Sequence, residues 1–388
     1  MVERVRAGAG LRETAREFGV SLSVIQRWVR HATGQRLDRV DWSGKTRAGC
    51  HPINRTERAV EILIIAVREH LDKSSDLGEH GAEAIHAALL EGASEKPPSV
   101  RTIGRIIERS GVLDAQRRVR RAAPPIGWYL PEVAARRAEV DSFDTVSGLV
   151  LSGGVEVVVL NGISLHGGLV TSWPEHSITA ERIALLLVQH WAQFGLPRYA
   201  QFDNGNVFVG SNRYADVIGR VMRTCLLLGV TPVFAPPREP GFQAAIESLN
   251  GRWQAKVWHR FERISLFELL EHSDRYIVAA RRRHALRIER APSRRVMPAN
   301  AVLDLQAHPR GTVIFIRRTD DRGVLSVLGR PFLIGPSWTQ RLVRAEVNLD
   351  ASVIRFFALR RRDPANQPLL VEHPYTLPRR RFAPVQHE

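Results

Sequence analysis

The stretch RYAQFDNG, residues 198–205, predicts a short buried strand that ends at an acid and runs into a turn. Its aromatic and apolar residues favour a strand, while Asn204 and Gly205 tolerate the positive φ of tight turns. In an ordinary turn, Asp203 would only accept a hydrogen bond from its own backbone. If other acids lie close to Asp203 in the fold, its position at a strand end indicates a functional site.

The residues on either side of this stretch alternate between strand-like and helix-like patterns. Three runs rich in β-branched residues come first and predict an antiparallel meander, with Gly153-Gly154 as one hairpin turn. Apolar residues at helical spacing then predict helices that alternate with two further strands. The expected strands cover 139–146, 155–164, 167–173, 198–203 and 230–237, and the expected helices 177–195, 211–229 and 242–261. This order predicts an α/β domain.

Acids stand at three prominent points of the pattern: Asp144 within the first strand, Asp203 at a strand end and Glu247 on the last helix. An acid inside an apolar strand costs several kcal/mol unless it is paired, hydrogen-bonded or bound to a cation. Three converging oxygen donors suit a hard cation such as Mg²⁺, and two such ions would promote phosphoryl transfer. The competing interpretation is that Asp203 is a turn residue and Glu247 a solvated helix residue.

The first strand carries a second aspartate, Asp141, three residues before Asp144. Because side chains alternate along a strand, these two acids face opposite sides of the sheet. The residues alone leave both open as the first acid of the site.

Residues 10–32 predict two short helices around a tight turn. Apolar stripes that include Phe18 and Ile25 mark the helices, Gly19 suits the turn, and Ser21 can cap the second helix. The pattern is typical of helix-turn-helix DNA-binding domains, although a plain helical hairpin has the same spacing. In a helix-turn-helix, the residues that face the groove would be Gln26, Arg27 and Arg30.

A second helical pair is expected within residues 80–114, broken at Pro97-Pro98 and with Ser99 as the cap of its second helix. The exposed face of that helix carries Arg101, Arg105 and Arg109. DNA contact and an ordinary solvated face explain these arginines equally well, and the tandem arrangement favours DNA. The sequence thus predicts two helix-turn-helix units, at 1–35 and 55–115.

The C-terminal part is basic and then rich in strands. Residues 281–295 hold seven arginines, which suits phosphate neutralisation or an ordinary basic helix face. Within 311–359, short β-rich runs alternate with Gly, Asp and Pro turns. This alternation predicts a small β-barrel at 305–365.

The composition favours a polyanionic partner. The 388 residues include 56 Lys and Arg against 40 Asp and Glu, for a formal charge of +16. Nucleic acid is the simplest such partner, with an acidic membrane surface as the rival. Cys50 and Cys225 are too few for a disulfide framework or a cysteine zinc site, and no apolar run approaches the ~20 residues that span a bilayer. We therefore expect a soluble protein in a reducing cytosol.

The order of the elements, the FDNG motif at 202–205 and the AAIESLNGRW motif at 244–253 resemble the DDE transposase and retroviral-type integrase superfamily. The resemblance extends over roughly residues 1–360, and the arrangement resembles that of bacterial insertion-sequence transposases. It favours Asp144 over Asp141 as the first acid. One departure is NGISLHGG at 161–168, where relatives commonly show an acid followed by a Ser-Arg pair. A degenerate or specialised relative therefore stays open.

This resemblance implies a ribonuclease-H-like catalytic core at 130–290, followed by a Mu-type β-barrel. It implies that Asp144, Asp203 and Glu247 hold two Mg²⁺ ions, with Mn²⁺ as a substitute, for cleavage of element ends and strand transfer. The candidates for DNA contact beyond Glu247 are Asn250, Arg252 and Lys256. The implied partners are double-stranded DNA at element ends and target, a second copy of the chain, and an ATPase helper in some systems. The implied location is the bacterial cytoplasm, at the nucleoid.

Two other functions stay open on the sequence. A non-catalytic DNA-binding protein, either a transcriptional regulator or an inactive transposase relic, would share the DNA affinity but lack metal-dependent cleavage. A ribonuclease acting on hybrids would fit the core and leave the flanking helical units unexplained.

Overall fold

A computed structural model of the chain describes residues 1–43, 56–92, 96–112, 126–211, 213–239, 241–261, 265–298, 303–361 and 363–378. The chain separates into two compact units, Met1–Ile65 and Ala66–Glu388. Cys50 and the ends of the second predicted helical unit, at 55 and 113–115, lie outside the described residues. Within these ranges, no helix is both long and apolar enough to cross a bilayer.

The N-terminal unit begins with α1 (Val2–Arg6), α2 (Leu11–Glu17), α3 (Leu22–His31) and the short 3₁₀ helix η1 (Leu37–Arg39). Both helices expected within 10–32 are present, joined by a turn in which Gly19 has a φ of 62°. Ile25 on α3 is fully buried. Phe18, expected on an inner stripe, is instead 44% exposed because α2 ends one residue before it. Ser21 takes the N-cap position, but its hydroxyl bonds Ser23 instead of the helix backbone.

Three further helices follow: α4 (Arg58–Ser74), α5 (Ala82–Glu91) and α6 (Val100–Arg109). The last two pack against each other, and each contributes a fully buried isoleucine, Ile85 from α5 and Ile103 from α6. The Ser99 hydroxyl accepts a hydrogen bond from the Thr102 amide at 3.3 Å, which confirms Ser99 as the predicted cap of α6.

A mixed nine-stranded sheet runs through the second unit in the order β11-β10-β9-β6-β5-β4-β1-β2-β3. Its first five strands are β1 (Val140–Val150), β2 (Glu156–Ser164), β3 (Val170–Glu175), β4 (Tyr199–Phe202) and β5 (Thr231–Phe234). β1 to β3 form the expected antiparallel meander, and β4 and β5 run parallel to β1. The sequence pattern predicted all five, so the α/β fold class is confirmed.

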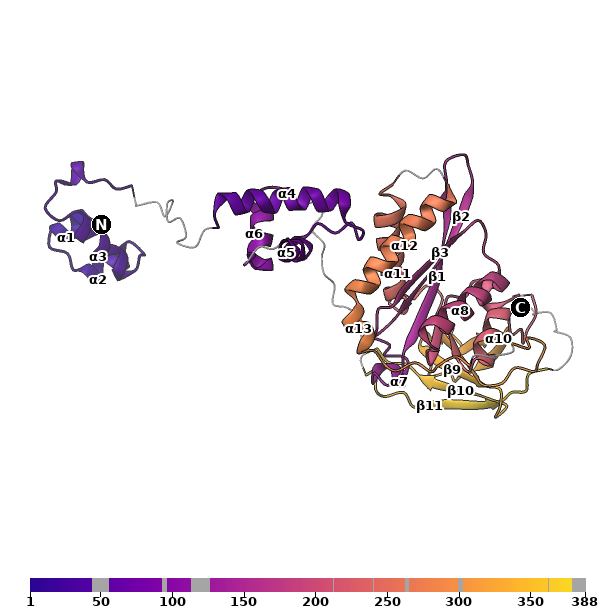
Figure 1. Cartoon of the computed structure of the whole chain (residues 1–388). Helices are drawn as coiled ribbons and strands as arrows, with labels where there is room; N and C mark the ends of the chain where they lie inside the picture. Colours follow the sequence, from indigo (N-terminus) through magenta and orange to yellow (C-terminus); the bar gives the residue numbers. More distant parts are fainter. Residues whose placement is uncertain are drawn as a thin grey trace. The chain divides into compact units, whose positions relative to one another are not determined.

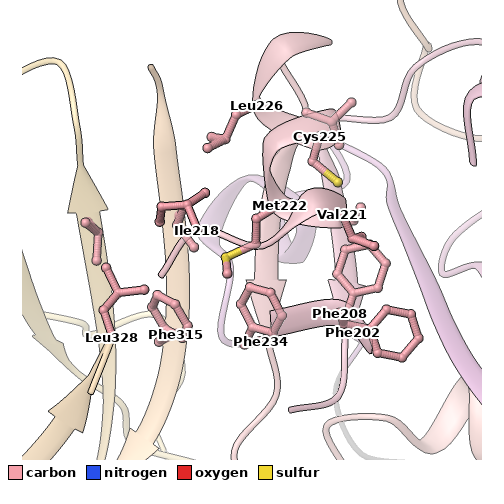
Figure 2. Packing of buried hydrophobic residues seen from close by; sticks show 14 of the residues in the cluster. Phe202, Phe208, Ile218, Val221, Met222, Cys225, Leu226, Phe234, Phe315 and Leu328 are labelled. Atoms are coloured by element: carbon pink, nitrogen blue, oxygen red, sulfur yellow. The ribbon is translucent and has the colours of Figure 1, made fainter. Parts of the chain in front are cut away.

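Helices cover both faces of these strands (Figure 1). α8 (Ala180–Phe194) and α10 (Arg220–Leu227) pack on one face, and α11 (Ala244–Trp253) and α12 (Leu266–Arg283) pack on the other. On the first face, Phe202, Phe234 and Phe315 lie on three neighbouring strands and share one core. Figure 2 shows Ile218 and Met222 reaching this aromatic core from the α10 side. The short helices α7 (Pro131–Ala134) and α13 (Ala285–Glu289) complete the helical elements of this region.

The helix expected over 211–229 is shorter than predicted and begins only at Arg220. A four-residue helix, α9 (Asn206–Val209), precedes it, and an irregular segment joins the two. The backbone turns tightly at this junction: a Cβ on Gly219 would lie 2.6 Å from the Val209 carbonyl oxygen. Beyond α11, the range expected for one long helix continues as a π-helical turn, η2 (Gln254–Trp258).

The C-terminal strands extend the core sheet, which corrects the prediction of a separate small barrel at 305–365. They are β6 (Thr312–Arg318), β7 (Val324–Val327), β8 (Arg330–Leu333), β9 (Leu342–Asn348), β10 (Val353–Ala358) and β11 (Leu369–Pro374). β6 pairs in parallel with β5, with Phe234 opposite Phe315, and β9 to β11 follow in antiparallel order. The physical reason is the unpaired edge of β5, which the apolar β6 covers. β7 and β8 form a hairpin of their own.

Gly162 in β2 tests how tightly the sheet packs beside the acids. A Cβ there would lie 2.6 Å from Cε1 of Phe143 and 2.7 Å from Cγ2 of Thr171. We expect Gly162→Ala to lower the free energy of unfolding by about 1–3 kcal/mol because these side chains must shift. Urea unfolding followed by tryptophan fluorescence measures the change.

Gly251→Ala is the matched control for this substitution. Gly251 lies in α11, and nothing lies within 4 Å of a Cβ built on it. Alanine also favours a helix by up to about 1 kcal/mol over glycine, so this variant should match or exceed the wild type. Equal losses in both variants would contradict tight packing at Gly162.

Candidate active site

The pairing of β1 with β4 brings Asp144 and Asp203 side by side. The two strands are parallel with Ser142 opposite Gln201, and the same register continued by two residues sets Asp144 opposite Asp203. Neighbouring strands lie about 4.8 Å apart, so both carboxyl groups share one edge of the sheet. Asp144 and Val146 are two residues apart on β1, so their side chains lie on the same face of the sheet. Val146 packs against α11 and α12, and Asp144 therefore faces those helices.

The Asp144 carboxylate is half-buried and accepts two hydrogen bonds. Its Oδ1 accepts one from the Thr145 amide at 2.8 Å, and its Oδ2 accepts one from Nδ2 of Asn250 at 2.8 Å. Burial, with the negative charges of Asp203 and Glu247, raises the pKa of Asp144 to about 6, although the hydrogen bonds from Thr145 and Asn250 lower it. The three predicted acids are therefore within electrostatic reach of one another.

Glu247 lies in the first turn of α11, where the helix dipole stabilises a negative charge. Its side chain is exposed, while Ile246 and Leu249 on the same helix are buried against the sheet. The indole of Trp253 donates to the Ser273 hydroxyl at 3.0 Å and ties α11 to α12. The helix is thus fixed to α12, and Glu247 is the most exposed carboxylate of the three.

Asn250 has a different role from the predicted DNA contact. It lies one turn after Glu247, is only 8% exposed, and donates to Asp144 as described above. Its Oδ1 accepts a hydrogen bond from Nδ2 of Asn161 on β2 at 2.9 Å. Asn250 therefore orients Asp144 through a buried amide pair. Sequence spacing could have indicated this, because residues three apart share one helix face.

The turn after Asp203 is held by its own polar side chains. The Gly205 amide donates to Oδ1 of Asp203 at 2.9 Å, and Nδ2 of Asn204 donates to the Ala235 carbonyl at 2.6 Å. Oδ1 of Asn204 accepts a hydrogen bond from the Arg317 guanidinium at 2.8 Å. The ordinary turn interpretation is correct for the Asp203 backbone contact, and the same carboxylate also faces Asp144.

Asp141, the alternative first acid, lies in a buried structural cluster. It is 1% exposed, accepts a hydrogen bond from the Trp191 indole at 3.0 Å, and forms an ion pair with Arg294. His190 lies 3.8 Å away, and burial lowers the pKa of this imidazole to about 4. Asp141 and Asp144 face opposite sides of the sheet, as alternation predicted. With Arg294 neutralising it, Asp141 has no charge left to offer a cation.

The chemistry of the acid cluster fits a hard divalent cation. Its candidate ligand atoms are all carboxylate oxygens. Their negative charges repel one another, and a bound cation would relieve this repulsion. Across the described ranges, however, no three His, Cys, Asp or Glu side chains are already drawn together as a closed metal-binding group. Two adjacent carboxylates and a third on an exposed helix turn thus form an open arrangement.

The two basic candidates beyond Glu247 differ in their contacts. Arg252 is exposed, and its Nε donates to the Ser248 carbonyl in the same helix at 3.2 Å. Lys256 instead donates to the Gly78 carbonyl at 2.8 Å, within the segment between α4 and α5. Arg260 donates to the Asp72 and Lys73 carbonyls in the last turn of α4 and to the Ser75 carbonyl just after it, so Lys256 acts here as an internal anchor.

The predicted DNA-facing residues of the N-terminal helices are exposed. Gln26, Arg27 and Arg30 lie on α3 and line a shallow surface hollow of about 370 Å³. The Arg27 guanidinium lies 5.4 Å from the centre of the Trp28 ring. On α6, Arg101 and Arg105 are exposed opposite the buried isoleucines. The sequence thus placed all five of these side chains on the surface correctly.

Comparison with known proteins identifies remote structural neighbours only. No family model and no curated protein matches the chain. The catalytic core of bovine immunodeficiency virus integrase matches with a TM-score of 0.27 at 18% identity, over 37% of this chain and 80% of that one. The simian T-cell lymphotropic virus intasome, in complex with the PP2A regulatory subunit B56 gamma, gives 0.31 at 14%, over 70% and 87%. The HTLV-2 integrase core in complex with magnesium gives 0.25 at 14%, over 36% and 82%.

The raised pKa of Asp144 predicts a pH dependence of stability in metal-free protein. The folded state keeps the Asp144 proton up to about pH 6, whereas an unfolded aspartate loses it near ~3.9. This group therefore lowers stability as the pH rises from about 4 to about 6, and adds no further loss above that. We expect Asp144→Asn to be more stable than the wild type at pH 7 by about 1–2 kcal/mol, and to lose this advantage near pH 4.

Urea unfolding in EDTA at pH 4.5 and pH 7 measures this difference. Asp321→Asn, which removes an exposed carboxylate, is the control and should keep the wild-type pH dependence. An Asp144→Asn variant with the same pH dependence as the wild type would show that Asp144 is not destabilised by its surroundings.

Proposed function

We propose that the protein is a DNA transposase or integrase that cleaves and joins DNA strands with metal-dependent acids. The observation that carries this proposal is the set of three acids around Asp144, in which Asp203 on the neighbouring strand and Glu247 on α11 act on one half-buried carboxylate. Such a charge excess is stable only with a cation or a proton. Carboxylates held close together in this way bind the metal ions of many enzymes that catalyse phosphoryl transfer.

Each residue of the set has a distinct task in this mechanism. Two Mg²⁺ ions held by Asp144, Asp203 and Glu247 would supply activation of the attacking oxygen and stabilisation of the leaving oxygen. Asn250 keeps Oδ2 of Asp144 oriented through its 2.8 Å hydrogen bond. The Asn204 side chain fixes the turn that presents Asp203. Exposed Glu247 would close onto the metal with the substrate, which accounts for the open arrangement.

The rest of the chain supplies DNA affinity under this proposal. The formal charge of +16 favours a polyanion, and Gln26, Arg27 and Arg30 offer donors on one exposed helix face. Residues of this kind contact phosphates and base edges when such a helix enters the major groove. We further propose that two copies act together, because joining two DNA ends requires two sites.

Strand transfer tests the catalytic part of the proposal. DNA carrying the sequences that flank the gene is labelled and incubated with Mg²⁺ and a target plasmid. We expect Asp144→Asn, Asp203→Asn and Glu247→Gln each to lower the joining rate by about 10³-fold or more while DNA affinity is kept, because each removes a charge that the cations need. Asp321→Asn should join at the wild-type rate.

The contradicting outcome is equally definite. If the wild type binds these ends but neither cuts nor joins with Mg²⁺ or Mn²⁺, the protein is a non-catalytic DNA-binding protein. If cleavage persists in Asp203→Asn, the acids are structural.

Salt dependence tests the DNA-binding part. In the double variant Arg27→Ala with Arg30→Ala, we expect weaker DNA binding and a slope of log K against log salt that is smaller by about 1.8, or about 0.9 for each lost phosphate contact. Fluorescence anisotropy with duplex DNA between 50 and 200 mM salt, roughly the range over which such contacts are lost, measures the slope. Arg39→Ala removes an exposed arginine of η1 and should leave the slope unchanged. An unchanged slope in the double variant would exclude α3 from the interface.

A further inference from the structure

Arg317, near the end of β6, is a half-buried arginine that pairs with no carboxylate of the described residues. Its guanidinium donates to the Ile316 carbonyl at 2.9 Å and to Oδ1 of Asn204 at 2.8 Å, and it lies 5.0 Å from the centre of the Phe315 ring. In the described part of the chain, no carboxylate forms an ion pair with it, and burial lowers its pKa to about 10. A buried charge of this kind is costly to the free protein.

The guanidinium lines a pocket of about 420 Å³. Its other walls are mostly apolar and include Val209, Val217 and Leu328, and Asn204 and the exposed Tyr214 also line it. Figure 2 shows Phe315 and Leu328 side by side on this face, beside Ile218. Pockets that hold small organic groups have this composition: apolar walls with one or two placed polar groups.

An ionic network around the buried Asp216 carboxylate holds the pocket wall that carries Leu328. Asp216 is 3% exposed and forms a salt bridge with Arg330 of β8 at 2.6 Å. It also accepts a hydrogen bond from the Tyr375 hydroxyl at 2.9 Å, and its amide donates to the Leu328 carbonyl at 2.8 Å. The β7–β8 hairpin is therefore held against the segment after α9. The pocket is formed before any ligand arrives.

The pocket opens at the same sheet edge as the acids. β4, β5 and β6 run parallel, so Asp203 and Arg317 both lie at the carboxyl ends of their strands, where ligands of α/β sheets bind. Arg317 is two residues from Phe315 on β6, so both side chains lie on the face of the sheet that α8 and α10 cover. Asp203 lies on the opposite face, beside Asp144. Asn204 is next to Asp203 in the chain and bonds Arg317 directly. One residue thus connects the two sites.

We propose that this pocket receives one unpaired nucleotide of the DNA substrate, with its phosphate on Arg317 and its base between the apolar walls and Tyr214. The inference rests on the proposed function and adds a binding site for the strand that is not joined. A guanidinium lacking a carboxylate is suited to bidentate contact with a phosphate. The cavity of about 420 Å³ has room for one base with its sugar. Bases taken out of a duplex are held by stacking and apolar contact of this kind.

The experiment compares DNA ends in fluorescence anisotropy, with the full chain in EDTA so that catalysis plays no part. The probes are one labelled duplex with a blunt end, the same duplex with a two-nucleotide 5′ overhang, and the overhang with abasic sugars. We expect the wild type to bind the overhang about tenfold more tightly than the blunt or abasic ends, as base stacking in a protein site gives.

Three variants test the residues. Arg317→Met removes the charge, and Ser326→Trp fills the pocket from an exposed wall residue while leaving Arg317 and Asn204 in place. The overhang preference should vanish in both. Arg318→Met is the matched control: it removes the next arginine, which is exposed and pairs with Glu239, and it should keep the preference. Arg317→Met should also melt at the wild-type temperature or above it, because it removes an uncompensated charge.

Three results would overturn the proposal: no overhang preference in the wild type, a preference that survives in Ser326→Trp, or a preference that requires only the sugar-phosphate. Thermal stabilisation of the wild type by a free deoxynucleoside monophosphate, with no overhang preference, would assign the pocket to a free nucleotide instead. Because strand transfer is not measured, a failure here is distinct from a failure of the acids.

Discussion

The parallel pairing of β1 with β4 is the constraint on which the site depends. It sets two like charges, Asp144 and Asp203, on neighbouring strands, a placement that costs free energy in the isolated protein. The surrounding structure supplies that free energy. Phe143 and Phe202 stack between the same two strands with ring centres 5.8 Å apart, and the core on their face contains α8 and α10. Burial of apolar side chains on one face of the sheet thus holds two mutually repelling carboxylates close together on the other face.

The two aspartates of β1 show how burial assigns different roles to one residue type. Asp141 faces the interior, where Arg294 and the Trp191 indole satisfy it and its charge is neutralised. Asp144 faces α11, where the Asn250 side chain and one backbone amide donate to it and no cation of the described residues pairs with it. A neutralised acid stabilises the fold, and an acid with unbalanced charge remains available for chemistry. The distinction lies in the partners, which come from positions 50 and 106 residues away in the chain.

The sequence predicted the elements of the core well, because alternation and helical spacing report burial directly. It predicted Ser99 as a cap and the surface position of Arg27 and Arg30, which are local properties. It could not predict that β6 would pair with β5, since the choice of a strand's neighbour depends on which edge is left open. Asn250 shows the same limit: its partner on β2 becomes visible only when the sheet has formed.

Two unbalanced charges of opposite sign therefore meet at one edge of the sheet without neutralising each other. The acids face α11, Arg317 faces the opposite side, and the neutral Asn204 lies between them. Because successive side chains of a strand point to opposite faces, the acids and Arg317 cannot form the mutual ion pair that would remove both costs. Under the two proposals made above, nucleic acid with its divalent cations would supply both partners at once: cations for the carboxylates and a phosphate for the guanidinium. Within the described residues, the acids lack a cation and Arg317 lacks a carboxylate, and a DNA end with its bound cations is the single ligand that the two proposals together assign to them.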